Sequence, residues 1–343
     1  MSLRVSGLGA WPGDEPLLAH QAIVDAFVDG PVPGLPHLAV LTERGPWAAP
    51  IGRTLALAES TGASLEPHGW RLGSSSHEQH LAHSTLALDI EAFAIASSGY
   101  SGPVALPVLG PLSLAASVWL PVGERALADR SAVEDLTAAL AVGVRRHAEA
   151  VAHGRGLGPA EADSDARAGA STTIVLHEPL LEHVVRGGIP TFSGMSRLRT
   201  VEPTVASELL RSLVRSWDGF DVVLVVPPNE TSIAAARAAG VKRIATDLTV
   251  LDRAGWDELA TAVEAGIGIW ASSVPHHFEG VKPNPGQSAR AILAPWRAVG
   301  LETSDWSPVL SARPGLGELS PDAARATLRD VGRTAAELAE LIA

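Results

Sequence analysis

The sequence predicts an α/β protein folded as a closed (β/α)8 barrel, and three observations support that prediction. First, short apolar runs rich in β-branched residues alternate along the chain with Ala- and Leu-rich segments of helical periodicity. Second, the apolar runs are continuous, which is typical of strands buried on both faces of a parallel sheet. Third, seven such runs and a weaker eighth in 343 residues match eight strand–helix units with insertions. The rival is an open doubly wound sheet, but no G-x-G-x-x-G follows the first strand and no G-x-x-x-x-G-K-[ST] loop occurs.

The predicted strands are the apolar runs that Gly, Pro or Asp residues bound. In chain order they are Arg4–Gly9, Val104–Leu109, Thr172–His177, Val222–Val226, Arg243–Asp247, Gly268–Ala271 and the weak Val309–Leu310, with Trp70–Leu72 as the candidate for an eighth. The predicted helices are Asp14–Val28, Ser131–Ala152, Thr204–Trp217, Glu230–Ala239, Arg253–Ala265, Pro285–Val299 and Ser320–Ile342. One helix is expected to begin at Ser131 with Glu134 completing a capping box, and the last has Pro321 in its first position.

Residues 1–343 are therefore expected to form a single barrel domain. The segment 154–170 is polar and rich in Gly, Ala and Asp, and it is predicted to be an exposed loop. A domain linker is the alternative interpretation of this segment. The strand–helix alternation continues on both sides of it, which favours the loop.

Composition excludes several classes of function. The absence of cysteine removes disulfides, thiolate nucleophiles, iron–sulfur clusters and Cys-ligated zinc. The net charge is −12 and no run of Lys and Arg exceeds two residues, which argues against nucleic acid and anionic membranes as partners. No apolar run approaches the length of a bilayer span, and the N-terminus has no apolar region of a signal peptide. We expect a cytoplasmic protein with a small-molecule substrate, and the oligomeric state stays open.

The candidate catalytic residues follow from one rule of this fold, that active sites are built at the C-terminal ends of the strands. His177 and Glu178 end one predicted strand, and Asp247 ends another. Glu178 would bind a substrate amine or act as a general base, or else it caps a helix beginning at Pro179, and the two interpretations have equal weight. Asp247 would bind a metal or a substrate cation, and its alternative is the N-cap of a short turn.

The candidate substrate-binding residues are Trp11, His37, Arg53, His276 and His277. His37 either places an imidazole near the mouth of the barrel or packs on a neighbouring tryptophan. Arg53 either contacts an anionic substrate or forms a surface ion pair. His276 and His277 are adjacent, so at most one of them is expected to face the mouth, and a surface-loop position is the alternative for each.

Several segments resemble the motifs of one family. They are Ser6-Gly7-Leu8-Gly9-Ala10-Trp11-Pro12-Gly13 for T-G-I-G-S-W-P-G, Leu35-Pro36-His37-Leu38 with Arg44-Gly45 and Ile51-Gly52-Arg53 for L-P-H-L…R-G…I-G-R, Gly110-Pro111-Leu112-Ser113-Leu114-Ala115-Ala116 for G-P-(I/L)-(T/S)-L-A-A, and His177-Glu178-Pro179 for D-E-P. The chain thus resembles short actinobacterial single-barrel proteins related to the catalytic domain of cobalamin-independent methionine synthase. The likeness runs from residue 6 to about residue 335. Each motif is weak alone, and their order is fairly specific.

This resemblance implies a TIM barrel of the methionine synthase/uroporphyrinogen decarboxylase superfamily. The implied reaction is transfer of a methyl group from a 5-methyltetrahydrofolate-type donor to a homocysteine-type thiol, in methionine biosynthesis. The implied cofactor is a zinc ion, held by an H-x-C motif, an acidic residue and a C-G-L motif. The implied place of Glu178 is in contact with an amino-acid substrate, because it matches the acid of the D-E-P motif.

The positions that match the zinc ligands hold other residues. Val225 and Pro227 stand at the H-x-C positions and Pro314 at the cysteine of C-G-L, so only Asp247 remains. We therefore expect no family zinc site, and three interpretations stay open. The first is a diverged, zinc-independent enzyme, a lyase of the decarboxylase type included. The second is a non-catalytic protein that binds a folate-like or amino-acid-like molecule, and the third is a methyltransferase with a rearranged His/Asp metal site.

Overall fold

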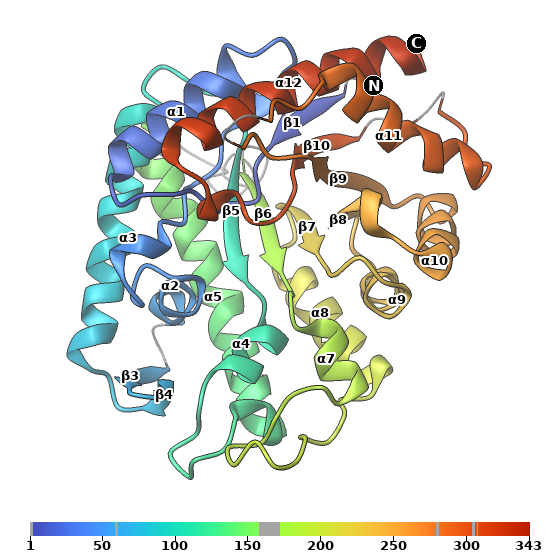
Figure 1. Ribbon diagram of the computed structural model, residues 1–343. Helices are drawn as coiled ribbons and strands as arrows, with labels where there is room; N and C mark the ends of the chain where they lie inside the picture. The colour runs from blue at the N-terminus through green and yellow to red at the C-terminus, as the bar shows by residue number, and fades with distance from the viewer. Residues whose placement is uncertain (1–2, 59–60, 158–171, 279–280, 304–305, 307) are drawn as a thin grey trace.

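Eight parallel strands form the centre of the molecule. The computed structural model describes residues 3–58, 61–157, 172–278, 281–303, 306 and 308–343. The strands of the central sheet are β1 (Arg4–Ser6), β2 (Gly34–Leu35), β5 (Val104–Leu109), β6 (Thr172–His177), β7 (Asp221–Val225), β8 (Arg243–Thr246), β9 (Gly268–Val274) and β10 (Val309–Ala312). Their order is β2-β1-β10-β9-β8-β7-β6-β5. From β5 onward, strands that follow one another in the chain therefore also lie side by side in the sheet. The predicted fold class is confirmed (Figure 1).

The sheet closes on itself between β2 and β5. An isolated parallel bridge joins His37 to Ala105, two residues beyond the end of β2. The amide of Leu38 donates to the carbonyl of Ala105 at 3.0 Å, and the amide of Ala105 donates to the carbonyl of Pro36 at 2.9 Å. These two bonds complete the ring, which excludes the open doubly wound sheet.

Helices surround the strands on the outside (Figure 1). They are α1 (Pro16–Val28), α2 (Pro50–Leu57), α3 (His77–Ala96), α4 (Pro111–Ser117), α5 (Arg130–Gly154), α7 (Leu181–Arg186), α8 (Pro203–Ser216), α9 (Glu230–Ala239), α10 (Arg253–Glu264), α11 (Pro285–Ala298) and α12 (Pro321–Ile342), with short 3-10 turns at η1 (Thr42–Arg44), η2 (Ala126–Ala128), η3 (Leu248–Val250) and η4 (Leu316–Glu318). All seven predicted helices are present within about two residues of their predicted ends. Ser320 caps α12 as predicted, because its side chain accepts a hydrogen bond from the amide of Ala323. Within the described residues, no helix is long and apolar enough to cross a membrane.

Two hydrophobic cores follow from this arrangement. The interior of the barrel is filled by Ala105, Val175, Val223, Ala245 and Trp270, one from each of β5 to β9. The larger core lies between the outer faces of the strands and the helices. Since side chains alternate along a strand, the interior residues fix which positions of each strand point inward. That alternation locates the candidate site below.

The predicted eighth strand at Trp70–Leu72 was wrong. This segment belongs to β4 (Gly69–Gly73), which pairs with β3 (Gly62–Glu66) in a separate antiparallel hairpin between α2 and α3. The strand that completes the barrel is β2, which follows Pro33 and precedes Pro36. A strand of two residues between prolines carries no apolar run, so hydrophobic periodicity cannot detect it.

The predicted start of the helix at Ser131 was also wrong by two residues. Asp129 is the N-cap of α5, because its carboxylate accepts hydrogen bonds from the amides of Ser131 and Ala132. Asp is as good an N-cap as Ser, so the capping-box pattern placed the N-cap two residues too late. Of the predicted exposed loop at 154–170, residues 154–157 follow or end α5, and 158–170 lie outside the described residues. The extent of the single domain stays a prediction.

Candidate functional site

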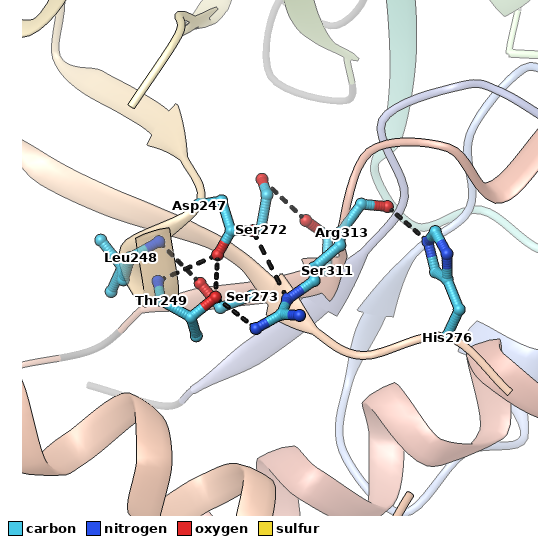
Figure 2. Close-up of polar contacts among 8 residues, drawn as sticks. All are labelled: Asp247, Leu248, Thr249, Ser272, Ser273, His276, Ser311 and Arg313. Carbon is cyan, nitrogen blue, oxygen red and sulfur yellow. Dashed lines mark hydrogen bonds and ion pairs between the residues drawn. The ribbon is translucent and has the colours of Figure 1, made fainter. Parts of the chain in front are cut away.

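A cluster of polar side chains lies at the C-terminal ends of β8, β9 and β10. Asp247 directly follows β8, and Arg313 directly follows β10. Figure 2 shows the Arg313 side chain reaching toward Asp247 and Thr249, with Ser272, Ser273 and Ser311 beside it. We call Asp247, Thr249 and Arg313 the Asp247–Arg313 cluster. It lies at the end of the barrel where this fold builds its active sites.

The contacts of the Asp247–Arg313 cluster are charge-assisted. Oδ1 of Asp247 accepts hydrogen bonds from the backbone amide of Thr249 at 2.9 Å and from its hydroxyl at 2.6 Å. Oδ2 of Asp247 lies 3.4 Å from Nε of Arg313, whose Nη2 also donates to the Thr249 hydroxyl. Asp247 therefore caps the turn η3 with one oxygen and pairs with a cation through the other. The Asp247 side chain is 9% exposed and that of Arg313 is 39% exposed, although Nε of Arg313 is itself buried.

The pleat of the strands directs this cluster to the inside of the barrel. Ala245 and Trp270 are paired and point inward, and Val309 of β10 pairs with Trp270. Two residues farther on, Ser272 and Ser311 are paired in the same way, and the Ser311 hydroxyl donates to that of Ser272 at 3.1 Å. The register then shifts by one residue between Ser311 and Ala312. Bulges of this kind re-aim side chains near active sites, and this one immediately precedes Arg313.

The two adjacent histidines point apart. Nε2 of His276 lies 2.9 Å from the carbonyl oxygen of Arg313, and Figure 2 shows this ring next to the cluster. The His277 amide donates to the Thr327 hydroxyl at 2.9 Å, and its ring lies 4.0 Å from Asp330, so His277 faces α12. His276 is thus the one of the pair that the structure places beside Arg313.

His177 lies on the inner face at the end of β6. It pairs with Val225 of β7, two residues after the inward-pointing pair Val175 and Val223. Burial lowers the pKa of His177 to about 4, and a hydrogen bond to the backbone of Leu8 partly opposes that shift. The neutral imidazole is therefore the form present at neutral pH. Its Nε2 is buried and has no hydrogen-bond partner among the described residues.

Glu178 points to a helix and not to the Asp247–Arg313 cluster. Its carboxylate accepts hydrogen bonds from the amide of Leu112 at 3.0 Å and from the amide and hydroxyl of Ser113 at 2.7 and 2.6 Å. The residue is fully buried, and that burial raises the pKa of Glu178 to about 7 although the three hydrogen bonds act in the opposite direction. Glu178 thus caps α4. The capping interpretation was wrong about the helix, because it predicted a cap on the helix beginning at Pro179. Gly110 makes room for it, since a Cβ there would lie 2.2 Å from Oε1 of Glu178.

Three other candidate residues, Trp11, His37 and Arg53, are buried. Trp11 is 2% exposed and packs in the outer core. The buried ring of His37 lies against Gly7 and Phe27. Arg53 is buried and forms an ion pair with Asp89 of α3, which Arg44 also contacts. In the structure, Trp11, His37 and Arg53 therefore have buried packing or ion-pair partners.

The residues at the positions implied for zinc do not fit that ion. Val225, Pro227 and Pro314 have no side-chain atom that binds a metal. Asp247 is the one implied ligand that remains, and a single carboxylate is fewer than the three or four protein ligands of a zinc site. Across the described part of the chain, no group of three or more His, Cys, Asp or Glu side chains is arranged to hold a metal ion. We therefore derive no step through zinc.

Sequence reasoning missed the central residue of the cluster, Arg313. Its strand was recognised only at Val309–Leu310, so the search for strand-end residues stopped short of it. The signal was present, because an arginine directly before Pro314-Gly315 follows the last apolar run. Thr249 was also missed, and it is found only by asking which hydroxyl follows Asp247 closely enough to donate a hydrogen bond to its carboxylate.

Comparisons with known proteins support the fold. No protein-family model matches the chain, and no curated protein matches it. Among solved structures, it is similar to a B12-independent methionine synthase from Shewanella sp. W3-18-1, in complex with selenomethionine. The two chains share 9% sequence identity over 99% of each, with a TM-score of 0.58. At this identity the likeness shows the fold alone, so membership of the methionine synthase family stays a prediction.

Proposed function

We propose that this protein is a methyltransferase-like barrel enzyme that binds a small molecule bearing an anionic group and acts without zinc. The observation that carries the proposal is the Asp247–Arg313 cluster, in which a carboxylate and a hydroxyl hold an arginine with a 39% exposed side chain at the end of the barrel. A guanidinium suits a carboxylate or a phosphate because its planar donors match two oxygens at once. The hydroxyls of Ser272 and Ser311 on the inner face add neutral hydrogen-bonding capacity next to it.

The charge balance of the cluster favours a zwitterionic ligand. Asp247 and Arg313 together carry no net charge, so a ligand with a single charge would leave one of them unmatched. An amino acid presents a carboxylate to Arg313 and an ammonium group to Asp247. Homocysteine and methionine are therefore the first molecules to test, with folates as the implied methyl donor.

A matched pair of arginine variants tests this proposal. Arg313→Met removes the proposed anion contact, and Arg243→Met removes a guanidinium that is also 39% exposed and paired with an aspartate, but at the N-terminal end of a strand. Loss of a charge-assisted hydrogen bond predicts that Arg313→Met weakens ligand binding by about 10- to 100-fold, while Arg243→Met binds as the wild type does. Calorimetric titration with homocysteine and methionine measures this. Equal affinities of the two variants would contradict the proposal.

Metal analysis separates the zinc-free proposal from a rearranged metal site. Protein purified without chelators should contain well below one zinc per chain, because three of the four implied ligand positions carry no metal-binding atom. Stoichiometric zinc would instead support a site built from Asp247 and histidines, and would overturn this part of the proposal.

A non-catalytic binding protein is the second candidate, and Glu178 is the observation that favours it. All the hydrogen bonds that its carboxylate makes go to α4, so the residue that the resemblance assigns to the substrate has another partner. An assay of methyl transfer from 5-methyltetrahydrofolate to homocysteine distinguishes the two candidates. Binding of both compounds without turnover would favour the binding protein.

A further inference from the structure

A cavity lies on the outside of the barrel, between the neighbouring helices α1 and α12 (Figure 1). Its volume is about 460 Å³, which is within the usual range of about 300–1,000 Å³ for small-molecule sites. The residues that line it are Gln21, Ala22, Asp25, Ala26, Arg325 and Arg329. None of them belongs to the Asp247–Arg313 cluster, so this cavity is a separate feature of the molecule.

The sequences of the two helices explain why a hollow forms here. Residues four positions apart lie on the same face of a helix. On α1 this spacing places Ala22 and Ala26 together, and on α12 it places Arg325 and Arg329 together. Ala22 is buried and Ala26 is half-buried, and their methyl groups are too small to fill the space opposite the arginines. The wall of the cavity on α12 is therefore cationic.

Arg325 differs from the other arginines whose Nε is buried without a hydrogen bond. Among the described residues there are five such arginines, namely Arg71, Arg125, Arg155, Arg313 and Arg325. The first four each have a hydrogen bond or an ion pair through another nitrogen of the guanidinium. Arg325 has neither at any nitrogen within the described part of the chain. A half-buried cation without a partner is unfavourable, so a ligand that supplies one would be stabilised here.

The charges around the cavity leave it positive. Arg329 also has no hydrogen bond or ion pair with any described residue, and two like charges four residues apart on a helix repel each other. The next residue, Asp330, pairs with Arg333 at 3.3 Å. Among the described residues that line the cavity, Asp25 is the one carboxylate, so two guanidinium groups face a single negative charge. An anion would balance the remaining positive charge.

We propose that the cavity between α1 and α12 binds a phosphate group that carries one proton. The unprotonated oxygens accept hydrogen bonds from Arg325 and Arg329, and the protonated oxygen donates one to the carboxylate of Asp25. A guanidinium suits phosphate because its planar donors match two oxygens at once. Asp25 selects the protonated anion, because a carboxylate accepts hydrogen bonds and has none to donate. The inference uses residues that the proposed function does not use.

The proton distinguishes phosphate from other anions. The second pKa of a phosphate group is about 6 in its monoesters, so near pH 6 a large fraction keeps one proton. Sulfate and acetate have none at that pH and would place a bare oxygen against Asp25. Calorimetric titration of the wild-type protein at pH 6 and constant ionic strength should therefore show sulfate and acetate binding at least about fivefold more weakly than phosphate. Equal affinity for sulfate and phosphate would overturn the proposal.

Two forms of phosphate are titrated, because the group could belong to a free ion or to a larger molecule. Tighter binding of inorganic phosphate than of methyl phosphate would assign the site to the free ion. Tighter binding of methyl phosphate would assign it to a phosphomonoester. If the wild-type protein binds neither at about 10 mM, the site does not exist and the proposal fails.

Variants on both helices locate the bound ion. Arg325→Met and Arg329→Met should each weaken phosphate binding by about tenfold or more, because each removes charge-assisted hydrogen bonds. Arg333→Met is the control, since this arginine is on the same helix, has a 65% exposed side chain and does not line the cavity. It should bind phosphate within about twofold of the wild type, and melting temperatures verify that all three variants fold. Equal affinities of the three variants would overturn the proposal.

Two further variants separate this site from its alternatives. Asp25→Asn offers an amide donor in place of the carboxylate, so sulfate should then bind within about twofold of phosphate. If Asp25→Asn strengthens both anions to the same degree, Asp25 only repels them and the proton-selective contact is wrong. Arg313→Met should leave phosphate binding unchanged. If Arg313→Met abolishes it while Arg325→Met does not, the ion lies at the Asp247–Arg313 cluster, which overturns this inference and leaves the proposed function standing.

Discussion

Two clusters in this molecule are built from arginine and aspartate, and they differ in what covers them. In the first, Asp89 of α3 lies between Arg44 and Arg53, and the carboxylate is fully buried. In the second, Arg313 pairs with Asp247 and its side chain is 39% exposed. The same residue types therefore form a sealed ion pair in the helical layer and an accessible one at the end of the barrel. The difference teaches that burial, and not residue type, separates an arginine enclosed by its partners from one whose side chain is partly exposed.

The sealed cluster also carries an excess of positive charge. Asp89 balances only one of the two guanidinium groups that contact it. Around it, burial and, as the second cause, the charge of Arg53 lower the pKa of His20 and His147 to about 3. The imidazoles therefore stay neutral and add no further positive charge. The stability of this cluster therefore depends strongly on the Asp89 carboxylate.

The largest effect is expected from a substitution that breaks the sealed cluster of Arg44, Arg53 and Asp89. Asp89→Asn leaves the buried Arg53 and the partly buried Arg44 without a carboxylate, and we expect the free energy of unfolding to fall by about 3–5 kcal/mol. Urea denaturation followed by circular dichroism measures this. Asp257→Asn is the control, because its pair with Arg253 is 4.0 Å long and both side chains are mostly exposed, so a change within about 0.5 kcal/mol is expected. If the Asp89→Asn protein were as stable as the control, the buried ion pair would not contribute more to stability than an exposed one, which would contradict the comparison.

The next largest effect is expected at Glu178, a buried carboxylate that, unlike Asp89, has no ion pair among the described residues. The pKa of Glu178 is raised to about 7 by burial, so the folded protein binds a proton that the unfolded chain has lost above pH 4.5. Stability therefore falls as the pH rises from about 4.5 to 7. Glu178→Gln cannot titrate, so the stability difference between the two proteins should change by up to about 3 kcal/mol over this range.

Thermal melts at several pH values follow this difference. Glu182→Gln is the control, since Glu182 is partly exposed and contacts Arg186. It should keep the pH dependence of the wild type. Because the Glu178 carboxylate faces α4, Glu178→Gln should also bind homocysteine as the wild type does. A pH dependence unchanged by Glu178→Gln would mean that the pKa of Glu178 is not raised, and a lost affinity would mean that this carboxylate serves the site.

The smallest effect on stability is expected at the Asp247–Arg313 cluster. Asp247→Asn keeps an oxygen to cap η3 and loses only the charge opposite Arg313, so unfolding should change by less than about 1 kcal/mol. Affinity for homocysteine should nevertheless fall at least about fivefold, because the carboxylate orients Arg313 and faces the ligand amine. Calorimetry and urea denaturation of the same sample give both numbers. A large loss of stability with unchanged affinity would make this cluster a second structural pair.

The sequence predicted those parts of the structure that depend on local patterns. Apolar runs located seven of the eight strands, and helical periodicity located the long helices. β2 escaped because a two-residue strand between prolines has no periodicity. At the candidate site, Asp247 and His276 were found by the strand-end rule. The partners of Arg53 and Glu178 lie 36 and 65 or more residues away, and tertiary pairing of that kind leaves no local signal.

The closure of the barrel at His37 and Ala105 has a consequence for how the ring opens. β5 and β6 pair along six residues, whereas two backbone hydrogen bonds join the chain after β2 to β5. Local opening of a folded protein follows the least stabilised junction, and native-state hydrogen exchange reports its free energy residue by residue. The pairings of β1 with β2 and with β10 are also short, with two residue pairs each. The amide protons of Leu38 and Ala105 should therefore exchange faster than those along the β5–β6 pairing.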